Sequence, residues 1–200
     1  MGKKLKNKPL VEALLEFRWK IAPMAPGELP SHYFPIFLGR FHGRLKDRYP
    51  YVEPLLSVQI PDELAAHTVK FRFRNGQDGW PLVQTGPGIA TLNFTDSYKW
   101  EPFRDEAFSV HADLLDAYGD DSKGPQFNTC MLRYINALPA DPESIELLQY
   151  LSKKFHLKLT LPPGIGDTEI VTGNCRGIQV RAAFPLKSPS GIGSVQLSTG

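Results

Sequence analysis

The chain has 200 residues, of which 42% are hydrophobic and 22% are charged, and its formal net charge is +2. These ordinary values exclude a disordered or fibrous protein, and so balanced a charge does not by itself indicate a nucleic-acid partner. Cys130 and Cys175 are too few for a disulfide framework or a cysteine metal site. No apolar run approaches the roughly 20 residues of a membrane span, and Glu12 and Glu16 interrupt the stretch where a signal peptide would be apolar. We therefore expect a soluble, cytoplasmic protein.

The clearest local pattern lies near the N-terminus, where apolar and polar residues alternate over residues 10–21. Phe17 and Trp19 share one side of this pattern, and Glu16 and Arg18 share the other. A period of two is typical of a strand with one face on a core. The alternation therefore predicts a half-buried strand.

Helical spacing and turn residues divide the rest of the first part of the chain. Ser31 is a suitable N-cap for a helix over residues 32–48, and a second helix is expected over 101–118. Between the two helices, four strands are expected over residues 52–60, 67–74, 80–85 and 89–94. Short links between consecutive strands favour antiparallel pairing.

The order of elements then starts again. A strand is expected over residues 129–138, followed by a helix over 142–155 that Asp141, Pro142 and Glu143 open. Further strands are expected over residues 157–161, 168–172, 177–186 and 194–198. This order predicts a tandem strand-helix-strands pseudo-repeat, with units over 1–126 and 127–200 that share one sheet or core.

The fold class follows from these elements. We expect an α+β protein with a twisted, largely antiparallel sheet and all of its helices on one face. Phe71 and Phe73 are expected to point toward the helices, and Lys70, Arg72 and Arg74 away from them.

Three sequence motifs stand out: PLVEALLEFRW over residues 9–19, WPLVQTGPG over 80–88 and LRYIN over 132–136. Together they resemble a sporadically distributed family of uncharacterised bacterial proteins. The resemblance implies a bacterial cytoplasmic protein and a longer chain than the one printed, so a C-terminal portion is expected to be missing. The order of elements in each half also resembles the fold class of the TATA-binding protein, which is a likeness of topology alone.

The motifs of common catalytic and cofactor sites are missing from the sequence. The five histidines show no HExxH pattern, and the glycines form neither a phosphate-binding loop nor a dinucleotide fingerprint. No nucleophile elbow occurs, and Glu12 and Glu16 would lie about 13 Å apart along one strand, too far for most hydrolytic carboxylate pairs. We expect no catalytic residue, no metal and no cofactor.

The candidate binding surface is the outward face of the sheet, because polar residues gather there. Its expected binding residues, in chain order, are Arg18, Lys70, Arg72, Arg74, Gln84, Asn93, Arg133 and Asn136. The first hypothesis is a non-catalytic binding or interaction module that holds a protein or a small polar ligand on this face.

Two alternatives stay open at this point. Nucleic acid could bind the basic residues of the face through its phosphates, although Glu12 and Glu16 on the same face disfavour this. An enzyme could instead have its site at the junction of the pseudo-repeat, built from Gln84, Asn93, Arg133 and Asn136, because polar residues on central strands need partners.

Overall fold

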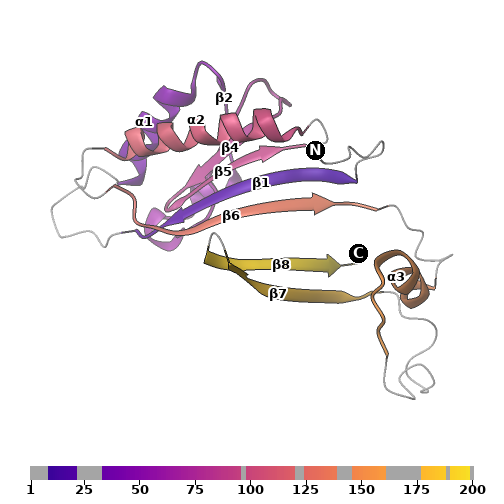
Figure 1. Ribbon diagram of the computed structural model, residues 1–200. Helices are drawn as coiled ribbons and strands as arrows, with labels where there is room; N and C mark the ends of the chain where they lie inside the picture. The colour runs from indigo at the N-terminus through magenta and orange to yellow at the C-terminus, as the bar shows by residue number, and fades with distance from the viewer. Residues whose placement is uncertain are drawn as a thin grey trace. The chain divides into compact units, whose positions relative to one another are not determined.

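The computed structural model describes residues 9–21, 33–95, 98–119, 124–138, 146–160, 177–187 and 190–198. The chain divides into two compact units, Met1–Ala137 and Leu138–Gly200. The first unit holds a six-stranded antiparallel sheet with two helices on one face, and the second holds a helix and a two-stranded hairpin (Figure 1). The α+β class, the antiparallel sheet and the position of the first two helices are confirmed, while the pseudo-repeat stays a prediction.

The first unit uses every element expected before residue 127 and one strand beyond it. In chain order its regular elements are β1 (Leu10–Trp19), α1 (Phe34–Leu45), β2 (Tyr51–Pro54), β3 (Phe71–Arg74), β4 (Leu82–Gly86), β5 (Ile89–Phe94), α2 (Trp100–Tyr118) and β6 (Phe127–Asn136). Across the sheet the strands follow the order β2-β3-β4-β5-β1-β6. Since β6 pairs with β1, the first unit extends to Ala137 rather than ending at residue 126.

The core of the first unit lies between this sheet and its two helices. Phe37, Phe41 and Leu45 of α1 are fully buried, and Phe73 and Leu92 face them from the sheet. Each large side chain that is fully buried contributes roughly 1.5–3 kcal/mol. This layer is therefore the main source of stability, and the predicted inward direction of Phe73 is confirmed.

A tight reversal joins the two central strands β4 and β5. Their register pairs Gly86 with Ile89, so Pro87 and Gly88 alone form the turn. Gly88 has a φ of +73°, which only glycine adopts without strain. A β-carbon on Gly86 would lie 1.8 Å from the carbonyl oxygen of Thr68, so the chain also needs glycine there for a close approach of two backbones.

Three expected strands differ from the structure. The strand over 52–60 ends at Pro54, and Leu56–Gln59 forms a 3₁₀ turn whose apolar side chains are exposed. The strand expected from residue 67 begins only at Phe71, because His67 has a positive φ and cannot continue extended backbone. In the second unit, residues 157–160 form no strand.

The second unit consists of α3 (Leu147–Phe155) and the hairpin of β7 (Gln179–Lys187) and β8 (Ser190–Ser198). The helix ends where His156 adopts a left-handed conformation. The expected helix starts at Ser31 and at residues 141–143, and the strand over 168–172, lie outside the described residues. The expected packing of the third helix on the sheet of the first unit stays a prediction.

Candidate functional site

The candidate site is the face of the six-stranded sheet opposite α1 and α2, which we call the polar face (Figure 1). Strand register aligns one residue from each of five neighbouring strands across this face. We call this set the polar row, and it consists of Glu53, Arg72, Gln84, Thr91 and Glu16, on β2, β3, β4, β5 and β1. Directly opposed residues share a sheet face, so five polar side chains follow one another in a line.

Hydrogen bonds join the members of the polar row across three of its four strand boundaries. Arg72 donates from Nη1 to Glu53 Oε1 at 3.3 Å and from Nε to Gln84 Oε1 at 2.9 Å. Gln84 donates in turn from Nε2 to Thr91 Oγ1 at 3.3 Å. The side chains of β2 to β5 are therefore held in fixed positions by their neighbours rather than projecting freely.

Asn93 connects the row to β1 from the adjacent line of residues. Its side-chain oxygen accepts from Thr91 Oγ1 at 2.7 Å and from Gln84 Nε2 at 3.2 Å, and its amide nitrogen donates to Glu12. Asn93 is only 4% exposed, and Thr91 is also buried. Buried polar groups must find partners, and here they find them in each other.

A single carboxylate on β2 pairs with both arginines of β3. Glu53 Oε2 accepts from Arg74 Nε at 2.9 Å, in addition to its contact with Arg72. The hydrogen bond from Arg74, together with the charges of both arginines, lowers the pKa of Glu53. Glu53 was not among the residues expected from the sequence, because nothing in the sequence indicated which carboxylate would face β3.

An ion pair occupies the β1 end of the row. Arg18 Nε lies 2.7 Å from Glu16 Oε1, and the two residues are neighbours on one side of the same strand. The side chain of Glu16 is nearly buried, whereas that of Arg18 is 40% exposed. Arg18 therefore presents its remaining surface to solvent.

The structure contradicts the expectation that Lys70 points freely outward. Lys70 is only 3% exposed, and its Nζ donates to the carbonyl oxygen of Ile60 and to the carboxylate of Asp62. Both acceptors belong to the segment between β2 and β3, which covers this end of the polar face. Lys70 stands immediately before β3, and alternation along the strand could not show that a neighbouring segment would bury it.

Two further expected site residues lie apart from the polar row. Arg133 lies on the polar face, opposite Leu14 of β1, and Leu14 lies opposite Asn93 of β5. Arg133 and Asn93 are therefore separated by two strand spacings, about 10 Å. Asn136 is four residues after Leu132, so both lie on the same face of β6. Leu132 pairs with Leu15, which packs against the core, so this is the helix-covered face. Gln84, Asn93, Arg133 and Asn136 therefore do not converge on one point.

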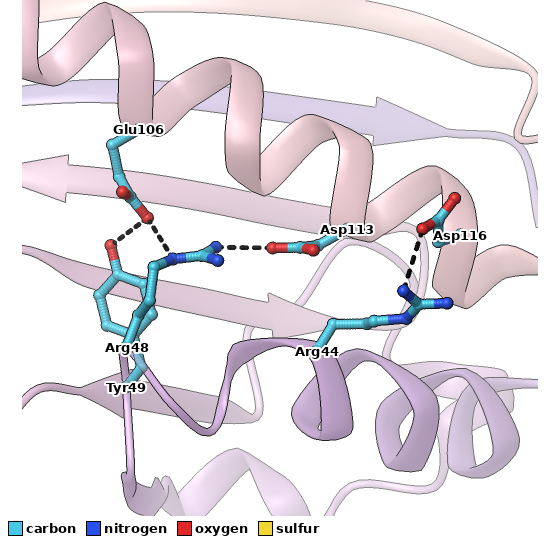
Figure 2. Close-up of polar contacts among 6 residues, drawn as sticks. All are labelled: Arg44, Arg48, Tyr49, Glu106, Asp113 and Asp116. Carbon is cyan, nitrogen blue, oxygen red and sulfur yellow. Dashed lines mark hydrogen bonds and ion pairs between the residues drawn. The ribbon is translucent and has the colours of Figure 1, made fainter.

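A second polar cluster joins α1 to α2 (Figure 2). Arg48 Nε lies 3.1 Å from Glu106 Oε1, and Arg48 Nη2 lies 2.6 Å from Asp113 Oδ2. Tyr49 donates its hydroxyl hydrogen to Glu106 at 2.9 Å, and burial, followed by the charge of Glu106, raises the pKa of Tyr49. All of these groups form their hydrogen bonds and ion pairs with one another, so we assign the cluster to helix packing rather than to binding.

The one buried hydroxyl group of the polar row has a partner that does not activate it. Thr91 donates its hydroxyl hydrogen to the amide oxygen of Asn93, which is not a base and cannot activate a nucleophile. Within the described ranges, no three metal-ligating side chains lie together. No helix in those ranges is long and apolar enough to cross a membrane.

Comparisons with protein-family models, with curated proteins and with solved structures return no match for this chain. The family resemblance of the three sequence motifs and the topological likeness to the TATA-binding protein therefore stay predictions.

Proposed function

We propose that this protein is a non-catalytic binding module that holds a polar partner, a protein segment or a small ligand, on the polar face. The observation that supports this most directly is the hydrogen-bonded polar row across β2, β3, β4 and β5, on the face that α1 and α2 leave uncovered. A solvated sheet face needs polar residues, but it does not need them linked and partly buried.

The exposed members of the face indicate the partner's chemistry. Arg18 and Arg72 keep 40% and 35% of their side-chain surface exposed, and Glu53 keeps 33%. Arg72 and Glu53 therefore offer a donor and an acceptor on neighbouring strands of the row, and Arg18 offers a further donor beside its β1 end. Such an arrangement suits a partner that itself carries both donors and acceptors.

The alternative of nucleic-acid binding is weakened by the way these charges are paired. Arg72 and Arg74 share the carboxylate of Glu53, and Lys70 is buried against Asp62. Nucleic acid binds through basic groups that replace the counterions of its phosphates, and these basic groups already have carboxylate partners. A bacterial cytoplasmic location remains part of the proposal, on the grounds of the family resemblance.

Affinity capture with point variants tests the proposal. The full chain, an Arg72→Ala variant and an Arg104→Ala variant serve as baits, and native mass spectrometry of the eluted complexes identifies bound molecules. Arg104 is the matched control, since it is an exposed arginine on α2 whose ion pair is with its neighbour Asp105. We expect a molecule that is retained by the wild type and by the control but lost with Arg72→Ala.

The result that overturns the proposal is equally specific. A polar face that binds nothing would give the same eluate from all three baits. Loss of capture with both variants would show that general charge, rather than the polar face, is responsible.

A further inference from the structure

The outer strand of the sheet, β6, has one edge that pairs with β1 and one edge that pairs with no strand among the described residues. This free edge extends along all ten residues of Phe127–Asn136. The strand contains no proline, its one charged residue is Arg133, and register shifts mark only its two ends, so most of the edge is open to pairing. Leu132 and Tyr134 are each 44% exposed along it.

The observed pairing of β6 with β1 shows how β6 packs against a sequence similar to its own. On its paired edge, Leu132 lies opposite Leu15, and Tyr134 lies opposite Ala13. The segment of β1 that makes these contacts reads ALLEF, and the corresponding segment of β6 reads CMLRY over residues 130–134. The two segments share a central leucine, an aromatic residue two positions later and a small residue two positions earlier.

We propose that the free edge of β6 pairs antiparallel with β6 of a second copy of this chain, with Leu132 opposite its own counterpart. This register repeats the observed β1–β6 pairing, because it places Leu132 against leucine and Cys130 against Tyr134 of the second copy. It also places Arg133 opposite Met131 of the second copy, so no like charges face each other directly. A twofold axis beside Leu132 makes the contact isologous and closed.

The helix above β6 adds apolar surface beside this edge. His111 of α2 lies with its ring centroid 5.7 Å from that of Phe127, so this side of α2 faces β6. Phe108 and Leu115 lie three residues before and four residues after His111 and share its side of the helix. Phe108 is 68% exposed, and exposed aromatic residues of this kind are typical of contact surfaces.

Analytical ultracentrifugation of the full chain, under reducing conditions, tests the proposal. The wild type is expected to dimerise with a dissociation constant roughly in the micromolar range. Leu132→Lys is expected to weaken the dimer at least about 10-fold, since two like charges would then face each other across the axis. Leu64→Lys is the matched control: it changes the net charge equally at a leucine that is 78% exposed, and it should leave the dimer intact.

A mixing experiment tests the register itself. Leu132→Lys and Leu132→Glu are each expected to dimerise at least about 10-fold more weakly than the wild type, and an equimolar mixture of the two is expected to associate more tightly than either variant alone, because opposite charges then meet at the axis. Circular dichroism verifies that both variants are folded. A wild type that is monomeric at about 100 µM, a dimer that resists Leu132→Lys, or a mixture that associates no more tightly than either variant alone would each overturn the proposal.

Discussion

Asn93 offers the most direct test of the polar network, because its side chain links three strands. It accepts hydrogen bonds from Thr91 and Gln84 and donates one to Glu12, while only 4% of the residue is exposed. Asn93→Ala removes all three contacts without adding volume. The neighbouring groups then remain in place, but they lose a partner.

The expected cost follows from which neighbours keep another partner. Gln84 retains its contacts with Arg72 and Thr91, so its loss is small. The buried Thr91 hydroxyl loses its acceptor, and the carboxylate of Glu12 loses a donor. A neutral hydrogen bond contributes about 1 kcal/mol and one to a charged group about 1.5–3 kcal/mol, so we expect a destabilisation of about 2–4 kcal/mol.

Urea denaturation followed by tryptophan fluorescence measures this cost in the first unit alone. All three tryptophans of the chain, Trp19, Trp80 and Trp100, lie within Met1–Ala137. The signal therefore does not report on the second unit, whose unfolding need not be coupled. With a slope of about 2 kcal/mol/M, the midpoint is expected to fall by about 1–2 M.

The control is Asn75→Ala, which removes an exposed asparagine with a single long contact, 3.3 Å to the carbonyl oxygen of Trp80. This control should shift the free energy of unfolding by no more than about 0.5 kcal/mol. If Asn93→Ala costs no more than Asn75→Ala, the network does not stabilise the sheet and the reasoning is wrong.

Three further predictions concern the rest of the first unit, each with urea unfolding as the measurement. Gly39→Ala in α1 should stabilise the first unit by about 0.5–1 kcal/mol, because the added β-carbon meets open space. Gly86→Ala should destabilise the same unit by several kcal/mol, because the added β-carbon clashes with the carbonyl oxygen of Thr68. Equal effects of the two substitutions would refute both assignments. Arg48→Ala should lower the free energy of unfolding by about 1–3 kcal/mol, because Asp113 loses this partner and Glu106 keeps only the hydroxyl of Tyr49; an unchanged midpoint would show that the cluster is dispensable. Because the pKa of Glu53 is lowered in the folded state, its pairing with the arginines stabilises the fold fully above the unfolded-state pKa of about 4.3, and this stabilisation is lost as the pH falls below that value. The difference in free energy of unfolding between wild type and Glu53→Gln should therefore shrink from about pH 6 toward pH 3. A constant difference would contradict this.

Alternation and helical spacing predicted much of the first unit because those patterns are local. The predicted strand over 89–94 coincides with β5, and the expected helix over 101–118 matches α2 within one residue. The same rule failed over 52–60, where apolar residues also alternate. Pro54 ends β2, and the residues beyond it turn into a 3₁₀ segment whose side chains point to solvent.

The partners of the polar residues could not be predicted, since they depend on contacts between distant parts of the chain. Arg48 and Glu106 are 58 residues apart, and Asn93 and Glu12 are 81 apart. Local pattern predicted an exposed Lys70 and could not show that Ile60 and Asp62 would bind its ammonium group. Thr91 was missed for the same reason, because its role appears only when register aligns it with Gln84 and Glu16.

The polar row also bears on how tightly a partner could be held. Arg72 is fixed by Gln84 on one side and by Glu53 on the other before any partner arrives. Ordering a long side chain on binding costs about 0.5–1.5 kcal/mol, and a side chain that is already ordered avoids that cost. Gln84 would then act as a positioning residue for Arg72.

This reasoning makes a prediction about affinity that differs from simple loss of a contact. Gln84→Ala should weaken binding of the captured partner about 2- to 10-fold, as measured by calorimetry, even though Arg72 is still present. Gln84→Glu keeps an oxygen that can accept from Arg72 Nε but loses the donor to Thr91 and Asn93, so it should restore only part of the affinity. If the alanine and glutamate variants bind equally well, Gln84 does not position Arg72, and the two residues contribute independently.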